Sequence, residues 1–139
     1  MRFFEFTNDK VICRLRWVTL AVMLTDAIVT LVGQPPNFWR DSKSVNEGEP
    51  IVRFFLSHGV IPYVVVGALY VAGVLFLASI TPRRIGLTIL FFFLLEHFWG
   101  ATSWFMYHFG YNIRLQNIFE LSIAVLIALA IGKGPKPAQ

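Results

Sequence analysis

Long apolar stretches with very few ionisable positions dominate the chain. From Gly59 to Pro82 there is no Asp, Glu, Lys, Arg or His. Three other stretches hold only isolated ionisable side chains: Asp26 in 17–39, Glu96, His97 and His108 in 85–113, and Glu120 in 115–132. A helix needs about 20 apolar residues to cross the ~30 Å hydrocarbon core of a bilayer. The pattern therefore predicts four membrane-spanning helices.

Helix-breaking residues set the expected limits of these spans. We expect them at about 11–33, 60–80, 85–109 and 112–131, since proline or glycine follows each apolar run. The polar segment 34–58 becomes the outer loop, and its apolar end, 51–56, is suited to a short helix on the membrane surface. The segment 1–6, with three phenylalanines, is also expected in the interface. The predicted fold is an all-α integral membrane protein, a four-transmembrane-helix bundle with short interfacial segments, forming a single membrane domain over 1–139.

The distribution of Lys and Arg predicts the orientation of the bundle. Eight lie on the side that carries both termini: Arg2, Lys10, Arg14, Arg16, Arg83, Arg84, Lys133 and Lys136. Four lie on the other side: Arg40, Lys43, Arg53 and Arg114. By the positive-inside rule both termini are cytoplasmic, in a multi-pass protein of the bacterial inner (cytoplasmic) membrane. The net charge of +4 is thus explained by topology and by contact with the lipid bilayer, and we expect no nucleic-acid partner.

The composition limits the possible functions. In 139 residues, 56% of them hydrophobic, four spans leave no room for a hydrophilic catalytic domain. A single cysteine, Cys13, excludes an internal disulfide and a cysteine-based metal cluster. Fourteen phenylalanines provide surfaces for lipid or for other membrane proteins. We therefore expect a non-enzymatic accessory or structural subunit that packs against a larger membrane complex.

Four ionisable residues fall near the middle of three spans: Asp26, Glu96, His97 and Glu120. An ionised group at the bilayer centre costs about 2.5–3.5 kcal/mol on insertion scales. We therefore expect these side chains to face inward and to meet one another, water, a metal or a partner. Other polar residues share their helical faces and would support this midplane cluster: Thr30, Ser103, Gln116 and Asn117.

The midplane cluster has several possible roles. The side chains could simply hydrogen-bond across helices and fix the packing, or they could relay protons or cations. Asp26, Glu96, His97 and Glu120 are also ligand types that suit iron, manganese or zinc, although no Glu-x-x-His motif is present.

His97 has aromatic neighbours and could bind a pigment, haem or quinone. Phe98, Trp99 and Trp104 lie close to it in sequence, and one histidine can be an axial ligand of a tetrapyrrole. His108 is too far along the same helix, about 16 Å, to ligate the same iron. A hydrogen bond from His97 to a carboxylate of another helix is the simpler expectation, and the sequence leaves the cofactor, if any, unassigned.

Two carboxylates of the outer loop, Glu47 and Glu49, are further candidates. They flank Gly48, which permits a tight turn before Pro50. A solvated turn is the simplest interpretation, but the carboxylates could also cover the outer end of the bundle or join Asp26 if the loop re-enters it. In the second span Gly67, Ala68, Ala72 and Gly73 predict close helix packing.

The first 60 residues resemble a family of small bacterial multi-span membrane proteins of unknown function. The resemblance lies in Asp26-x-x-x-Thr30 of the first span, followed by Asn46-Glu47-Gly48-x-Pro50 and Phe54-Phe55-Leu56. The family pattern has asparagine before the proline, where this chain has Glu49. The resemblance implies a helical membrane fold and a membrane location, and it implies no activity.

Overall fold

The computed structural model describes residues 9–107 and 113–131, and these residues form helices and loops without strands. Four long helices are present: α1 (Lys10–Val32), α3 (Val60–Ile80), α4 (Arg83–Tyr107) and α5 (Ile113–Ile131). Between α1 and α3 lie two 3-10 turns, Pro36–Trp39 and Ser42–Ser44, and the short helix α2 (Pro50–Ser57). The interfacial segment expected at 1–6, the predicted span ends at 108–109 and 112, and the C-terminal tail lie outside the described residues.

Three helices are long and apolar enough to cross a membrane: α1, α3 and α4. The apolar part of α5, Gln116–Ile131, is shorter than these. The chain is therefore an all-helical protein with three candidate membrane spans within the residues described.

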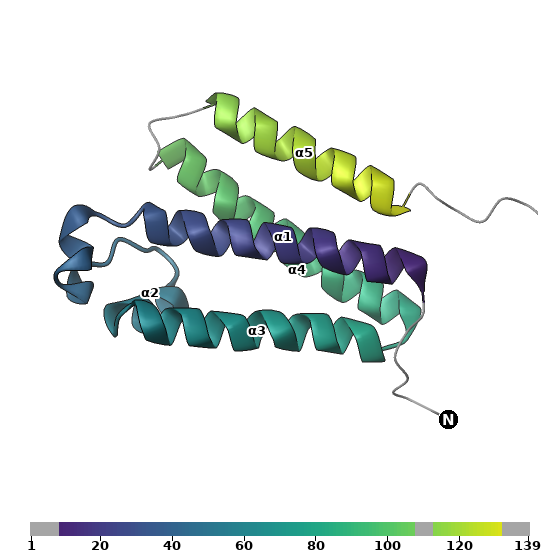
Figure 1. Ribbon diagram of the computed structural model, residues 1–139, viewed down its shortest axis with the longest axis horizontal. Coiled ribbons are helices and arrows are strands. Elements are labelled where there is room, and N and C mark those ends of the chain that lie inside the picture. Colours follow the sequence, from purple (N-terminus) through teal and green to yellow (C-terminus); the bar gives the residue numbers. More distant parts are fainter. Residues whose placement is uncertain (1–8, 108–112, 132–139) are drawn as a thin grey trace, which may run out of the picture.

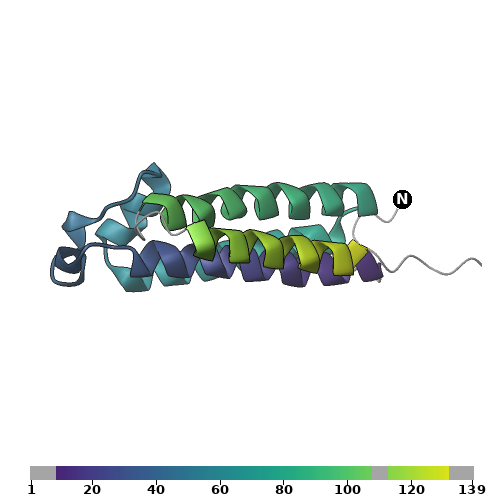
Figure 2. The ribbon, with the colours of Figure 1, turned by 90° about the horizontal axis from the view of Figure 1, so that it is seen from above.

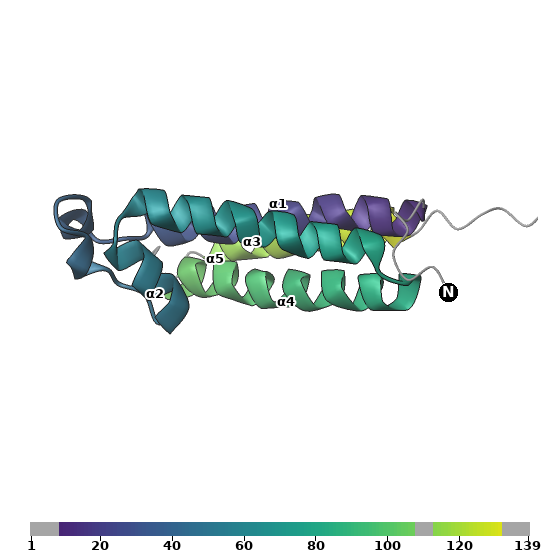
Figure 3. The same cartoon turned by 90° about the horizontal axis from the view of Figure 1, so that it is seen from below.

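The helices α1 and α4 run parallel and form the centre of the bundle. Their mutual contact is the most extensive in the structure, and α3 and α5 each contact both of them. Figure 1 shows α3 and α5 on opposite sides of this central pair, and Figures 2 and 3 show the four helices aligned along one long axis. The loop containing α2 lies at one end, together with the end of α4. We call this the loop end, and the opposite end, where α1 begins, the basic end.

Apolar side chains between α1 and α4 build the core. Ile12, Leu15 and Val22 of α1 are fully buried, as is Leu90 of α4. The Thr19 hydroxyl lies within this core and donates to the Leu90 carbonyl at 3.4 Å. Each fully buried aliphatic side chain contributes about 1.5–3 kcal/mol when its alternative is water. In a bilayer that contribution is largely absent, so close packing and polar contacts carry more weight.

The glycines that allow close helix approach differ from those predicted in the second span. A Cβ added to Gly67 or Gly73 of α3 would meet nothing within 4 Å, so neither residue is needed for packing. Gly86 of α4 is needed, because its Cβ would lie 2.6 Å from the Ala78 carbonyl oxygen of α3. The predicted close packing is therefore wrong for Gly67 and Gly73.

At the basic end, Asp9 joins the start of α1 to the start of α4. Its carboxylate accepts hydrogen bonds from the backbone N–H groups of Val11 (2.8 Å) and Ile12 (3.1 Å), which caps α1. The same side chain accepts a bond from the Arg83 guanidinium at 2.7 Å. The Arg83 bond and the Ile12 bond hold the pKa of Asp9 below its ordinary value of 3.8.

We predict that the Asp9 contacts stabilise the bundle in a pH-dependent way. Because its pKa is lowered on folding, Asp9 contributes its full stability above pH 3.8 and loses it as the pH falls through the folded-state pKa. Asp9→Ala should lower the free energy of unfolding in detergent at pH 6 by an amount typical of a lost helix cap, about 0.5–2 kcal/mol. The difference from the unmodified protein should shrink as the pH is lowered from 3.8 through the lowered pKa of Asp9. A difference that does not change as the pH is lowered from 6 through this range would contradict this role.

Candidate functional site

The side chains of Asp26 and His97 meet between α1 and α4. Asp26 lies six residues before the end of α1 and His97 near the middle of α4, and Oδ2 of Asp26 is 2.7 Å from Nδ1 of His97. Both side chains are largely enclosed, with 18% and 19% of their surface exposed. This is the interhelical carboxylate–histidine contact that the sequence favoured for His97.

Tyr70 of α3 completes the contact on the second ring nitrogen. Its hydroxyl lies 3.3 Å from Nε2 of His97, and its ring packs edge-on against Phe93 of α4. With Asp26 ionised, Nδ1–H of His97 donates to the carboxylate, and Nε2 accepts from the Tyr70 hydroxyl. We call Asp26, His97 and Tyr70 the polar triad, which ties three helices together at one level.

Gly100, which has no side chain, leaves room for the Asp26 carboxylate of the triad. A Cβ at this position of α4 would lie 2.7 Å and 2.9 Å from the two carboxylate oxygens of Asp26. Gly100 lies one turn from His97 on the same helix, so the carboxylate rests against bare backbone there. Ser103, a predicted supporting residue, donates its hydroxyl to the Gly100 carbonyl at 2.6 Å and does not reach Asp26.

From the triad, polar side chains continue toward the loop end. Thr30, one turn after Asp26, is buried, and its hydroxyl forms a hydrogen bond with Tyr63 of α3. The Tyr63 hydroxyl is close enough to both Asp26 and Glu47 for the two carboxylates to act on it electrostatically. Thr30 therefore takes the supporting position expected for it, through a tyrosine that the sequence did not single out.

The loop itself is fastened to α1 by Gln34, which is only 5% exposed. Its amide donates to the carbonyls of Thr30 (3.0 Å) and Asn46 (3.3 Å), and its oxygen accepts from the Asn46 N–H at 2.9 Å. This two-way bond to Asn46 holds the turn against the end of α1.

The two loop carboxylates differ in their setting. The Glu47 carboxylate accepts from the Glu49 N–H at 3.0 Å, and the Glu47 carbonyl accepts from the Arg53 guanidinium at 2.7 Å. Glu49 is exposed and directly precedes α2, which begins at Pro50. The turn is thus internally bonded. Of the two carboxylates, Glu47 is the one whose charge reaches Tyr63.

The remaining midplane candidates do not join the triad. Glu96 is exposed on the outside of α4, and its charge acts electrostatically on Tyr70 of α3. Glu120 accepts from the Gln116 amide of its own helix at 2.8 Å, and Asn117 is exposed on α5. The expectation that all four ionisable groups meet is therefore wrong for Glu96 and Glu120. Successive residues of a helix point about 100° apart, so Glu96 and His97 cannot both face α1.

The described residues contain no group of three or more His, Cys, Asp and Glu side chains placed to hold a metal ion. His97 already directs both ring nitrogens to protein partners, Asp26 and Tyr70. His58, the other described histidine, directs Nδ1 to the Phe54 carbonyl at 2.7 Å in the loop region. This geometry does not gather His97, Glu96, Asp26 and Glu120 into the metal site considered for them, and it occupies both ring nitrogens of His97, the residue considered as a tetrapyrrole ligand.

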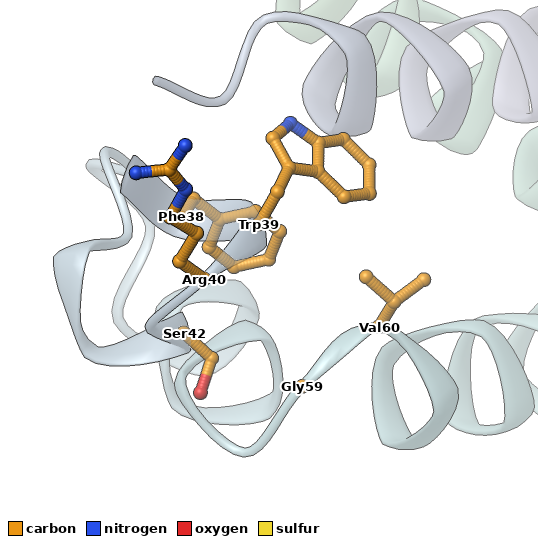
Figure 4. A pocket seen from close by; sticks show the side chains of 6 residues that line it. All are labelled: Phe38, Trp39, Arg40, Ser42, Gly59 and Val60. Carbon is orange, nitrogen blue, oxygen red and sulfur yellow. The ribbon is translucent and has the colours of Figure 1, made fainter. Parts of the chain in front are cut away.

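A separate cavity of about 240 Å³ lies at the loop end, between the 3-10 turns and the start of α3. Figure 4 shows Trp39 and Val60 on either side of the opening, with the Arg40 guanidinium directed away from the Ser42 hydroxyl. Ser42 donates to the Ser57 carbonyl at 2.8 Å. The cavity lining contains no His, Asp or Glu, so it offers no group for acid–base chemistry near neutral pH.

The chemistry available to the polar triad is proton exchange at one imidazole. Proton uptake at Nε2 of His97 makes an imidazolium paired with the Asp26 carboxylate, and the Tyr70 hydroxyl then turns from donor to acceptor. Tyr70 and Gly100 became recognisable as parts of this site only from the structure, although Gly100 shares a helical stripe with Glu96 in the sequence.

No known protein family, curated protein or solved structure matches this chain.

We predict that Gly100→Ala destabilises the bundle and Gly67→Ala does not. The new methyl group at position 100 would push the Asp26 carboxylate aside. Because this carboxylate is held by the 2.7 Å bond to His97, we expect a cost typical of overpacking, about 1–3 kcal/mol. At position 67 the methyl meets nothing, and replacing a helical glycine gains about 0.5–1 kcal/mol. Thermal unfolding of both variants in detergent measures the difference. Equal unfolding temperatures for the two variants would contradict the contact.

Proposed function

We propose that this chain is a four-span protein of the bacterial inner membrane, with both termini cytoplasmic, that works as a small subunit packed against another membrane protein. The helix lengths and the Lys and Arg distribution support this proposal. The observation that carries it is the outward position of Glu96.

Glu96 lies thirteen residues after the start of α4 at Arg83 and eleven before its end at Tyr107. In a spanning helix this is the middle of the membrane, where an ionised carboxylate facing lipid costs about 2.5–3.5 kcal/mol. Its side chain is exposed on the bundle surface. A second protein that presents a cationic or hydrogen-bond-donating side chain at this depth would remove the cost.

The surroundings of Glu96 suit such a contact. Large side chains on the same outer side of α4 are strongly exposed: Phe92 (60%), Leu95 (61%) and Trp99 (77%). Aromatic residues around a single polar group are typical of the central part of protein interfaces. We call Phe92, Leu95, Glu96 and Trp99 the outer α4 face, and we propose that it contacts the partner subunit.

We predict that Glu96→Leu releases the protein from its assembly without unfolding it. Leucine is favourable against lipid, so a chain that merely exposes Glu96 to lipid would gain stability, whereas a chain that binds through Glu96 would lose its partner. The native mass after gentle extraction should fall from an assembly to the single chain. Glu96→Gln, which keeps hydrogen-bonding capacity, should retain part of the assembly.

Thr88→Val is the matched control, because Thr88 is exposed on the same helix and donates to the Arg84 carbonyl of its own backbone. This variant should leave the native mass unchanged. An unmodified protein that runs as a lone monomer from its own membrane would refute the proposed subunit role.

A second candidate function is proton handling through the polar triad. It is favoured by the 2.7 Å Asp26–His97 contact and by the Thr30–Tyr63 hydrogen bond, which lies between this pair and the loop end. Ionisable pairs inside membrane helices are typical of proton relays. The site would then take up and release a proton at His97.

For this second candidate we predict proton flux in liposomes that contain the purified protein and a trapped pH-sensitive dye. His97→Gln and Asp26→Asn should each reduce the flux at least about tenfold, in line with the loss of a general acid–base group. Glu120→Gln is the control, since Glu120 bonds within α5 and should not affect the flux. Flux equal to that of protein-free liposomes would rule out this function.

A further inference from the structure

A groove between α1 and α3 near the basic end is lined by Arg16, whose guanidinium has a buried nitrogen without a hydrogen-bond partner among the described residues. The cavity has a volume of about 250 Å³ and is lined by Cys13, Arg16, Trp17, Leu20 and Leu75. Arg16 lies six residues into α1, about 9 Å from the start of the helix along its axis. In a spanning α1 this depth is just inside the boundary between headgroups and acyl chains.

The Arg16 guanidinium has an unmet hydrogen bond. Its Nε is buried and has no hydrogen-bond partner, and no other buried side-chain nitrogen or oxygen of the described residues is in this position. A buried donor without an acceptor costs about 1–3 kcal/mol, and more when it belongs to a charged group. An anion in the groove would supply the acceptor.

The charge at this end of the bundle favours an anionic ligand. Five cationic side chains of the described residues belong to this end: Lys10, Arg14, Arg16, Arg83 and Arg84. Asp9 is the nearest acidic residue in sequence, and it already bonds Arg83 and the backbone of α1. Basic pockets between membrane helices typically bind the headgroups of anionic lipids.

The apolar part of the groove identifies the ligand more closely. Leu20 lies one turn from Arg16 toward the middle of the bundle, Leu75 of α3 lines the facing wall, and the Trp17 side chain is 73% exposed. A free phosphate ion would make no use of these apolar walls, but an acyl chain would. We propose that Arg16 binds the phosphate of an anionic phospholipid whose acyl chain lies over Leu20 and Leu75. This inference rests on the membrane location of the bundle and is independent of a partner subunit.

The test measures lipid retained by the purified protein in native mass spectrometry. Phosphatidylglycerol, phosphatidylcholine and inorganic phosphate are each added over a concentration series. We expect phosphatidylglycerol to bind in preference to the other two. Arg16→Gln should lower its affinity about fivefold or more, the effect expected for one Arg at the membrane surface. Arg14→Gln removes the same charge two residues away, on nearly the opposite side of α1, and should have the smaller effect.

Several results would overturn the proposal. Equal losses for Arg16→Gln and Arg14→Gln would show attraction to overall charge without a site. Phosphatidylcholine binding as tightly as phosphatidylglycerol, or inorganic phosphate displacing the lipid at equal concentration, would also reject it. Arg16→Lys keeps the charge and lacks the Nε donor, so it serves if Arg16→Gln fails to fold. A lower affinity of Arg16→Lys for phosphatidylglycerol than that of Arg14→Lys would support the site. Equal affinities of these two variants would reject it.

Discussion

The bundle depends above all on the hydrogen bond between Asp26 and His97 inside its central helix pair. In water, the burial of Ile12, Leu15 and Leu90 would hold α1 on α4, but acyl chains are as apolar as these residues. What lipid cannot replace is the Asp26–His97 hydrogen bond, extended by Tyr70 to α3. Gly100 permits that bond by leaving room for the carboxylate. The register of three helices at the level of the polar triad thus follows from these four residues.

The same constraint divides the ionisable groups into two kinds. Asp26 and His97 satisfy each other inside the bundle, whereas Glu96, one residue before His97, is directed outward. A carboxylate on the outside of a spanning helix requires a neighbour that lipid does not supply. Internal pairing therefore suits a role in packing or proton exchange, and outward exposure suits a role in assembly. The buried Arg16 Nε at the basic end, which has no partner within the described part of the chain, follows the same logic, and an anionic headgroup is its proposed neighbour.

Much of the fold could be predicted from the sequence, because an uncharged run such as 60–80 allows few structures other than a long helix. The bond between His97 and a carboxylate of another helix could also be predicted from the sequence, because an isolated polar group in a membrane span requires a hydrogen-bond partner. The direction in which each helix faces was harder to predict. The position of Glu96 and Glu120 along their helices suggested that they lie beside Asp26. The rotation of α4 and α5 about their axes, however, depends on packing such as the stacking of Phe98 on Phe119, with ring centroids 5.5 Å apart. Which glycines matter depends on helix crossings, so Gly86 and Gly100 could not be distinguished from Gly67 by sequence spacing.

The most direct test of the central contact is a double-mutant cycle with Asp26→Ala, His97→Ala and the pair. Unfolding free energies would be measured for the four proteins under one detergent condition. Hydrogen bonds between membrane helices typically give coupling energies of about 0.6 kcal/mol and up to about 1.7 kcal/mol. The short 2.7 Å bond predicts a value in the upper part of this range. Additive effects of the two substitutions, with no coupling energy, would contradict the account.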